Sequence, residues 1–401
     1  QTFGRNQEIA RRESYKTWWM KKTFRRPEGN GPFTLEFGGV CNVCTVWLNG
    51  KRLGSHEGMF GGPSFDVSDR LRDENVLMVK LEAIPYANPA GANPDENRGW
   101  VNTVVFNNVY GWHYSNCPSL GIWRSVTLRE EPAVSLRAPY VTARDTQGNA
   151  DLVVDMLGDG NWSGTLSGTI RPDNFEGDAL SFQTTVKGRG RKSLHLRLQI
   201  PDPRLWWPNT MGPQNLYAMT LAFEPDRGGK SDEASFTFGL RTIEMAPFPE
   251  GPKPEFYNWT FVINGKPTFV KGTGWCTMDP LMDFRRERYD RFLSLARDQH
   301  CQMIRAWGAG MPETDDFFDL CDRYGIMVMQ EWPTAWNSHE TQPYDVMEET
   351  VRLNTLRIRH RASLAMYGAG NESGHPFGKA IDMMGRLSIE LDGTRPFHRG
   401  E

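Results

Sequence analysis

The segment from Ser363 to His375 carries the residues whose types and spacing most clearly suggest chemistry. A short apolar run, Leu364–Tyr367, ends in glycines and is followed at once by Asn371 and Glu372. A buried parallel strand delivers the side chains at its C-terminal end to the mouth of a barrel, where such folds hold their active sites. A carboxyl group in that place is positioned for proton transfer, so we predict that Glu372 is a general acid.

The C-terminal part of the chain, residues 247–401, alternates apolar runs with helical patterns. The predicted strands are Thr268–Lys271, Met303–Trp307, Ile326–Gln330 and Leu364–Tyr367, and the predicted helices are Arg285–Gln299, Asp315–Tyr324, Tyr344–Arg361 and Ala380–Leu391. This alternation is typical of a parallel sheet with helical crossovers. Four units occupy about 150 residues, whereas a complete eightfold barrel needs roughly 250. We therefore expect about the first four β/α units of a TIM barrel, in a chain that is either truncated or completed from elsewhere, because an open sheet exposes an edge strand.

The residues before this part predict two β domains, so the expected fold class is multidomain β plus α/β. Residues 1–134 contain alternating strand-like runs at Phe33–Phe37, Val43–Leu48 and Val76–Glu82. The dipeptide Asn49-Gly50 favours a hairpin, because both residues tolerate positive φ. Residues 83–102 are rich in Pro, Asn and Gly and predict a long surface loop.

Residues 135–246 predict a second, smaller β-sandwich. The expected strands are Ala150–Met156, Gly164–Ile170, Leu194–Ile200, Leu216–Phe223 and Ala234–Phe238. The basic stretch 186–192 is expected to be the solvated tip of a hairpin. A proline-rich linker, residues 247–254, then leads into the α/β part.

Composition excludes several classes of function. The formal net charge of the 401 residues is −3 and there is no strongly basic stripe, so we expect no nucleic-acid partner. No apolar run approaches the length of a membrane span, so no membrane partner is expected either. The 14 Trp and 22 Phe predict large aromatic cores, with stacking against sugar rings as the sharper alternative for some of them.

The six cysteines do not suggest a metal site, and we expect no cofactor. Cys41 and Cys44 form a CxxC pair inside one strand-like run, Val40–Trp47, where alternation would point them to opposite faces. Buried free thiols are the default expectation. No signal peptide is visible and the chain starts at Gln1, as in a processed or trimmed product. The compartment stays open, with a periplasmic or secreted location preferred to a cytoplasmic one.

Ordered motifs along nearly the whole chain resemble glycoside hydrolase family 2, which includes β-galactosidases, β-mannosidases, β-glucuronidases and exo-β-glucosaminidases. The motifs are Trp18–Phe24, Val46–Gly50, Leu53–Gly58, Phe65–Val67, Leu120–Arg124, Leu205–Pro208, Phe238–Arg241 and Phe261–Pro267 with Lys271-Gly272. The resemblance implies a jelly-roll sugar-binding-like domain at 1–134, an immunoglobulin-like β-sandwich at 135–246 and the N-terminal half of a TIM-barrel catalytic domain at 247–401.

The resemblance also implies a retaining exo-β-glycosidase acting on a carbohydrate substrate by double displacement. Glu372 is then the acid/base, with a pKa that burial and a neighbouring nucleophile would have to raise, and Asn371 binds the 2-hydroxyl of the sugar. The family nucleophile is a Glu after strand seven. Glu390 and Glu401 come too early to be that residue, so the nucleophile is expected to be missing from this sequence.

Further substrate contacts are predicted after the other strands, and each has a structural alternative. The candidates are Arg305, Trp307, Trp275, Asp279, Glu331 with its neighbour Trp332, and His375. Arg305 either orients the nucleophile by a bidentate contact or forms a structural ion pair. Trp307 is either a sugar platform or part of the barrel wall. Glu331 either contacts substrate or supports the rim, and His375 either contacts substrate or caps the next helix.

The sugar specificity stays open at this point. The run Asn371–His375 favours a β-galactosidase, whereas Arg305–Gly308, Asp316–Asp322 and Tyr110–Trp112 favour a β-mannosidase. A non-catalytic carbohydrate-binding protein is the alternative function. Assembly of the barrel from two chains, as a homo-oligomer or with a separate partner, is a third hypothesis.

Overall fold

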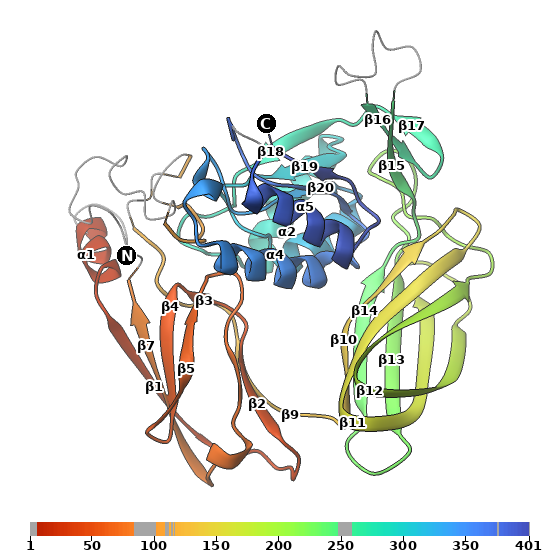
Figure 1. Cartoon of the computed structure of the whole chain (residues 1–401). Helices are drawn as coiled ribbons and strands as arrows, with labels where there is room; N and C mark the ends of the chain where they lie inside the picture. The colour runs from red at the N-terminus through yellow and green to blue at the C-terminus, as the bar shows by residue number, and fades with distance from the viewer. Residues whose placement is uncertain are drawn as a thin grey trace.

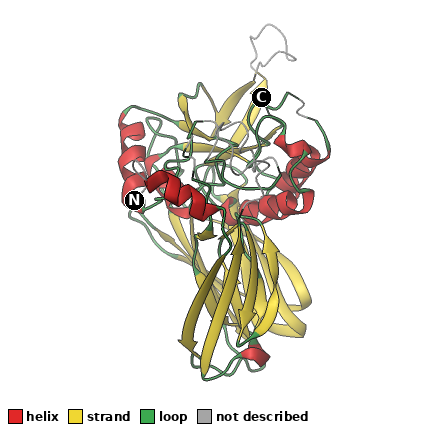
Figure 2. Cartoon of the chain, turned by 90° about the vertical axis from the view of Figure 1, so that its left-hand side faces the viewer, coloured by secondary structure: helices red, strands yellow, loops and turns green. Residues whose placement is uncertain are grey.

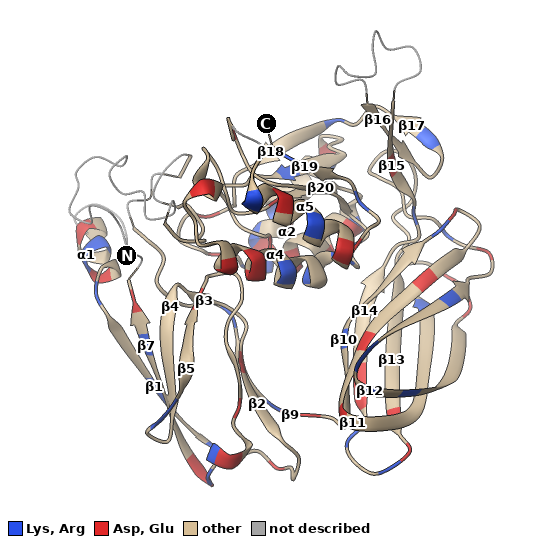
Figure 3. Ribbon diagram, in the orientation of Figure 1, with Lys and Arg blue, Asp and Glu red and all other residues tan. Residues whose placement is uncertain are grey.

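The computed structural model describes residues 6–83, 102–108, 112, 113, 115, 117–247, 259–374 and 377–400. Two β bodies lie side by side against one side of an α/β body (Figure 1). Apart from α1 and a short turn, the helices gather on the α/β body (Figure 2). Basic and acidic residues are interspersed along the ribbon of all three bodies (Figure 3). No described helix is both long and apolar enough to cross a membrane.

The first β body is a sandwich of short strands. Its elements are α1 (Asn6–Ser14), β1 (Trp18–Arg25), β2 (Phe33–Phe37), β3 (Val40–Cys41), β4 (Val43–Leu48), β5 (Lys51–Glu57), β6 (Ser64–Asp66), η1 (Ser68–Arg70), β7 (Glu74–Glu82), β8 (Gly121–Ile122) and β9 (Val126–Glu130). The sheets are ordered β1-β7-β4-β5 and β6-β2-β9, with β3 paired to β8. Alternate side chains such as Cys44, Val46 and Leu48 point into one buried cluster, as a period of two requires.

Most predictions for this body are confirmed. All three predicted strands form, and Asn49 (φ 52°) and Gly50 (φ 80°) make the turn between β4 and β5. The single run Val40–Trp47 was wrong, because the chain divides it into β3 and β4 and so places Cys41 and Cys44 on different strands. All six cysteines are free, and four of them are buried. The predicted loop at 83–102 falls almost wholly outside the described residues.

The second β body is a sandwich built from one curled sheet. Its strands are β10 (Val134–Ala143), β11 (Asn149–Pro172), β12 (Leu180–Gln199), β13 (Tyr217–Pro225) and β14 (Asp232–Phe238). The first half of β11 pairs with β10 and its second half pairs with β13, while β12 follows β11 along both halves. The curl encloses a separate apolar cluster.

Two predictions for this body were wrong. The two strands expected at 150–156 and 164–170 are one strand, β11, with a register irregularity between Leu157 and Asn161. The basic stretch 186–192 is not a hairpin tip but the middle of β12. Lys187, Arg189 and Arg191 alternate with less exposed residues, so the basic composition marks the solvent face of a strand and not a loop.

The barrel body is a parallel sheet covered by helices. Its elements are β18 (Gly272–Trp275), α2 (Arg286–Asp298), β19 (Met303–Ala306), α3 (Asp315–Tyr324), β20 (Met327–Glu331), η4 (Ser338–Glu340), α4 (Tyr344–Ile358), β21 (Leu364–Gly368), α5 (Lys379–Leu391) and β22 (Phe397–His398). The order is β18-β19-β20-β21-β22, with every neighbouring pair parallel. The predicted partial barrel is confirmed, and β22 adds a fifth strand to the four expected.

The first barrel strand was predicted at the wrong place. A separate antiparallel sheet, β15 (Ile243–Pro247), β16 (Trp259–Ile263) and β17 (Lys266–Thr268), precedes the barrel. Asn264 (φ 49°) and Gly265 (φ 77°) form a tight turn that folds β17 back onto β16. The expected strand Thr268–Lys271 is therefore replaced by β18, which begins after Lys271.

Both β bodies are fixed to the barrel body by hydrogen bonds that involve backbone carbonyls. Arg241, which follows the second β body, donates from Nε to Ala362 O (2.8 Å) and from Nη2 to Leu364 O (2.6 Å). Asn354 on α4 donates to Phe60 O of the first β body (2.9 Å). The contacts of Arg241 lie at the start of β21, so they help to fix the strand that carries the predicted acid.

Candidate active site

The candidate site lies where β19, β20 and β21 end. These strands are parallel neighbours, so their C-terminal ends meet at one edge of the sheet. The glycines at this edge are required by close packing. A Cβ on Gly368 would lie 2.7 Å from Glu331 Cγ, and one on Gly370 would lie 2.5 Å from Thr334 O. The glycines that follow the apolar run of β21 thus allow the chain segments around the site to approach each other.

Arg305, Glu331 and Asn371 form one polar group. Arg305 donates from Nε to Glu331 Oε1 (2.7 Å) and from Nη2 to Glu331 Oε2 (3.1 Å). The same Nη2 donates to Asn371 Oδ1 (2.8 Å). The Glu331 side chain is fully buried, and its Oε2 also accepts the backbone N–H of Gly308 (2.7 Å). The bidentate partner of Arg305 is therefore Glu331, and the pair holds the Asn371 amide.

The backbone around Asn371 is tied to the loop after β20. Asn371 N donates to Thr334 O (3.1 Å), and Asn371 O accepts from Trp336 N (3.0 Å). Glu372 has φ 46°, Trp336 has φ 49° and Asn337 has φ 63°. Non-glycine residues with positive φ are uncommon, and they concentrate at functional sites where the surrounding structure holds them.

Glu372 is exposed and is held by an indole. Trp336 donates from Nε1 to Glu372 Oε2 at 2.5 Å. The burial expected for Glu372 is not present among the described residues. Trp336 was not predicted from the sequence. The signal that could have indicated it is its place in the loop directly after the third strand, because the loops after the strand ends build barrel active sites.

Trp307 packs in the wall beside this group. Its side chain is 5% exposed, and its ring meets that of Trp336 edge-on, with centroids 5.8 Å apart. His113 of the first β body lies 6.3 Å from Trp307 between ring centroids and hydrogen-bonds Thr277 O through Nε2 (2.8 Å). Burial lowers the pKa of His113. The first β body therefore contributes a residue close to the site, which sequence reasoning missed.

Trp332, the neighbour of Glu331, points away from solvent. It is fully buried and stacks on Tyr367, with ring centroids 5.6 Å apart. Its place in the helix-facing core makes it part of the packing behind the sheet.

Trp275 and Asp279 are not brought into the polar group. Trp275 donates from Nε1 to Glu313 Oε1 (2.9 Å), and Glu313 is fully buried, which raises its pKa. Asp279 accepts from the backbone N–H of Leu281 (2.7 Å) and from Arg288 Nη1 (2.6 Å). His375 lies outside the described residues.

The sheet that carries the site is not closed by the described residues. Among the described residues, the sheet ends at β18 on one side and at β22 on the other. A cavity of about 810 Å³ lies elsewhere, between the first β body and the barrel helices, and none of the predicted site residues that the structure describes lines it. The described residues thus contribute one wall of a barrel mouth, with an amide, an arginine and a carboxylate at its edge.

Comparison with known proteins agrees with this architecture. Residues 1–124 match the model described as glycosyl hydrolase 2 galactose-binding domain-like, residues 134–241 match glycosyl hydrolases family 2, and residues 257–401 match the TIM barrel domain of that family. The chain therefore belongs to glycoside hydrolase family 2.

The relatives are glycosidases by name. The chain is 27% identical to a mannosylglycoprotein endo-beta-mannosidase of Lilium longiflorum, with 97% of this chain and 46% of the relative covered. It is 26% identical to beta-mannosidase B of Emericella nidulans, covering 92% and 45% respectively. The chain thus spans about half the length of the curated relatives it matches.

Solved structures share the fold. A beta-D-mannosidase from Dictyoglomus thermophilum superposes with a TM-score of 0.85 at 24% identity, covering 99% of this chain and 52% of that one. An exo-chitosanase from Amycolatopsis orientalis gives a TM-score of 0.76 at 20% identity, covering 98% and 46%.

Proposed function

We propose that this protein is a retaining exo-β-glycosidase in which Glu372 is the acid/base and Asn371 binds the sugar. The observation that carries the proposal is the place of Asn371 and Glu372 directly after β21, the fourth parallel strand, where the family pattern has its acid/base. We further propose domain boundaries near residues 134 and 246.

Glu372 would act at the glycosidic oxygen. In a retaining mechanism two carboxyl groups lie about 5–5.5 Å apart, and one protonates the leaving oxygen while the other attacks the anomeric carbon. The Trp336 indole N–H donates to Glu372 Oε2 and so restrains the position of the carboxyl group. Its Oε1 is left to face the substrate. In the second step the carboxylate takes a proton from the water that hydrolyses the glycosyl-enzyme.

Asn371 would act as a hydrogen-bond donor to the sugar. Arg305 donates to Asn371 Oδ1, which fixes the amide so that Nδ2 faces away from the arginine. An Nδ2–H group in that orientation can donate to the 2-hydroxyl. We propose that Glu331 does not touch substrate and instead holds Arg305, since its carboxylate is buried and already accepts from Arg305 and Gly308.

Of the remaining predicted contacts, two are assigned a supporting role and two are kept as substrate contacts. Trp275 and Asp279 are held by Glu313 and Arg288, so in this proposal they support the rim of the site. Trp307, beside Trp336, and His375 stay predicted substrate contacts.

We propose a terminal β-mannoside as the substrate, with a β-galactoside as the competing choice. The support is that the curated relatives described above are named as mannosidases. The family nucleophile follows a seventh strand, and the described sheet has five. The nucleophile would therefore come from sequence outside the described residues or from a partner chain.

The test uses the longest natural reading frame that contains this sequence. Turnover of 4-nitrophenyl β-mannoside, β-galactoside, β-glucuronide and β-glucosaminide is measured side by side. In Glu372→Ala, azide is expected to restore the rate on an activated aryl glycoside and to give the β-glycosyl azide, because the anion needs no general base. An active protein whose Glu372→Ala variant keeps its rate on poor leaving groups would exclude Glu372 as the acid.

The non-catalytic alternative makes an opposite prediction. A carbohydrate-binding protein would bind mannose or galactose by calorimetry and would release no nitrophenol in any of the four assays. Sedimentation of the same sample tests assembly, because a catalytically active and stable monomer excludes completion of the barrel by a second chain.

A further inference from the structure

A cavity of about 810 Å³ lies where the first β body meets the outer, helical side of the barrel body. The first β body contributes residues from the end of β2, from the loop before β6 and from the segment between β8 and β9. The barrel body contributes the segment before α2, the start of α3 and the second half of α4. The cavity is separate from the candidate active site.

Arg124 lines this cavity, and no residue in the described part of the chain is its polar partner. Its guanidinium makes no hydrogen bond or ion pair with any described residue. The guanidinium instead lies over the ring of Trp123 in a cation–π contact, with Arg124 Cζ 4.4 Å from the ring centroid. Trp123 is itself fixed, because its Nε1 donates to Met59 O (2.8 Å).

The two glycines beside Arg124 are required by its position. A Cβ on Gly38 would lie 3.1 Å from Arg124 Cβ. One on Gly39 would lie 2.7 Å from Trp123 Nε1 and 3.2 Å from Arg124 Cδ. The arginine stem is thus clamped between a glycine backbone and an indole, so the guanidinium is held in place before any ligand arrives.

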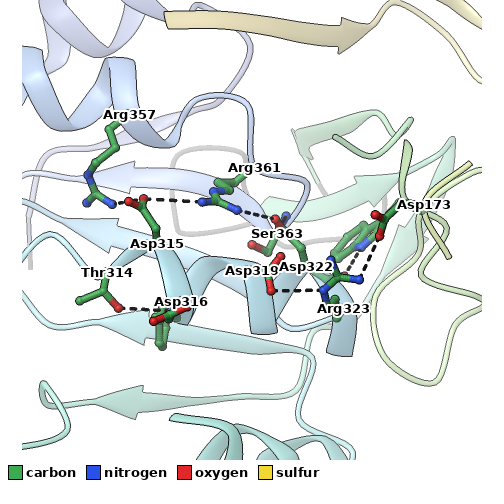
Figure 4. Close-up of polar contacts among 12 residues, drawn as sticks. Asp173, Thr314, Asp315, Asp316, Asp319, Asp322, Arg323, Arg357, Arg361 and Ser363 are labelled. Atoms are coloured by element: carbon green, nitrogen blue, oxygen red, sulfur yellow. Dashed lines mark hydrogen bonds and ion pairs between the residues drawn. The ribbon is translucent and has the colours of Figure 1, made fainter. Parts of the chain in front are cut away.

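Apart from Glu36, which is considered below, the other charged groups that line the cavity are already paired. Asp315 at the start of α3 accepts from Arg357 Nη1 (2.7 Å) and lies 3.6 Å from Arg361 Nη2. Figure 4 shows this carboxylate between the two arginines. Arg285 forms a two-bond contact with Asp283 (2.7 and 2.8 Å). Neither carboxylate forms a hydrogen bond or ion pair with Arg124.

Leaving Arg124 unpaired has an electrostatic cost. Burial, together with the positive charge of Arg357, lowers the pKa of Arg124 to about 9. A desolvated cation is normally found with an anion, because burying an isolated charge is expensive. A guanidinium presents a planar fork of N–H donors that matches the oxygens of carboxylate and phosphate groups.

We propose that this cavity is a binding site for a small oxyanion, a carboxylate or phosphate group, held by the fork of Arg124. The cavity has room for more than the anionic group, and Trp123, Phe284 and Leu353 give it apolar walls. The occupant therefore carries its charge on a larger organic body, such as an acidic sugar or a phosphorylated metabolite.

A change at Glu36 on β2 is expected to alter anion affinity in the direction opposite to a change at Arg124. It lines the same cavity, is exposed, and makes no ion pair or side-chain hydrogen bond with the described residues. Its negative charge opposes an anionic ligand. Removing that charge by Glu36→Gln is therefore expected to tighten binding, whereas Arg124→Met, which keeps most of the stem, is expected to weaken it.

Isothermal titration calorimetry at pH 7 and constant ionic strength measures the binding of three probes, sodium phosphate, sodium acetate and sodium D-glucuronate. Neutral D-glucose serves as the uncharged control for glucuronate. Arg285→Met is the matched control variant, since Arg285 lines the same cavity but is already paired. We expect Arg124→Met to weaken binding by about 10- to 100-fold. Glu36→Gln should tighten it by about 2- to 5-fold, and Arg285→Met should change it by less than about twofold.

The outcomes separate cleanly. Binding of phosphate alone assigns a phosphoryl ligand, and binding of acetate and glucuronate without glucose assigns a carboxylate. No saturable binding of any of the three anions overturns the proposal, as does equal binding by the natural protein and Arg124→Met. If Arg124→Met does not fold, Glu36→Gln decides, because unchanged affinity in that variant also overturns the proposal.

Discussion

Replacing Glu331 by Gln is the sharpest test of how the candidate site is held together. The change keeps the shape of the side chain and removes one charge. In the natural protein Oε1 accepts from Arg305, and Oε2 accepts from Arg305 and from the Gly308 N–H. Whichever oxygen becomes the amide NH₂ group will face at least one donor, so at least one hydrogen bond becomes a donor–donor contact.

The cost follows from burial. The Glu331 side chain is 0% exposed and that of Arg305 is 27% exposed, so the arginine keeps some access to water. A hydrogen bond to a charged group contributes about 1.5–3 kcal/mol, and breaking a fully buried ion pair costs about 3–5 kcal/mol. With the exposure of Arg305 taken into account, we expect Glu331→Gln to lower the free energy of unfolding by about 2–4 kcal/mol. At a urea m-value of roughly 2 kcal/mol/M this shifts the midpoint by about 1–2 M.

The assay is urea unfolding of this chain followed by tryptophan fluorescence and by far-UV circular dichroism, which should coincide if the barrel body unfolds in one step. Glu349→Gln is the matched control. Glu349 pairs with Arg352 at 2.6 Å, but the two side chains are 47% and 40% exposed. We expect that control to cost less than about 0.5 kcal/mol. If the two variants lose equal stability, the buried group does not hold the site as described.

Three further changes test other parts of the structure. In the longest natural reading frame, Trp336→Phe should slow hydrolysis of substrates with poor leaving groups more than of activated ones, measured as a ratio of kcat/KM values. An unchanged ratio would contradict the role proposed for Trp336 beside the proposed acid. Gly370→Ala should destabilise the chain by about 2 kcal/mol or more, because its Cβ would lie 2.5 Å from a carbonyl oxygen, whereas Gly274→Ala, with nothing within 4 Å, should be close to neutral in the same urea assay. Burial raises the pKa of Glu313 in the folded protein. The fold therefore gains stability from protonated Glu313 at low pH, and it loses that stability as the pH rises above the ordinary pKa of a glutamic acid and through the raised pKa of Glu313. Glu313→Gln should remove this loss of stability, because the glutamine amide does not titrate and can still hydrogen-bond the Tyr289 hydroxyl. If the urea midpoints at pH 4.5 and pH 8 differ by the same amount in the natural protein and in the variant, this explanation is refuted.

Local sequence patterns predicted the elements wherever one face is buried. The helix Asp315–Tyr324 was predicted with the bounds that it has, because its N-cap Thr314 and C-terminal Gly325 are chemically distinct from the helix interior. The first barrel strand failed for the opposite reason. β18 is mostly exposed, so no alternating or continuous apolar run marks it. The strand was therefore predicted in the more apolar residues just before it.

The residues of the candidate site also fall into those that local sequence patterns predicted and those that they did not. Asn371 and Glu372 were predicted because they directly follow a strand, which is a one-dimensional signal. Trp336 and His113 were not predicted, because both reach the site through contacts with distant residues. Trp336 is 36 positions away from Glu372 in the sequence, and His113 belongs to a different body from its neighbour Trp307. No local pattern specifies such pairs.

By itself the sequence determined the α/β character of the C-terminal part, the two β bodies before it, and the amide–carboxylate pair at the end of the fourth parallel strand. These follow from residue periodicity and from glycine placement, which act over a few residues. Only the tertiary structure decided that Arg305 pairs with Glu331, that an indole holds Glu372, and that Arg124 enters a cavity between two bodies without an ion-pair partner among the described residues. The physical reason is that a charge or a donor acquires its partner, and its cost of burial, from the packing of distant segments.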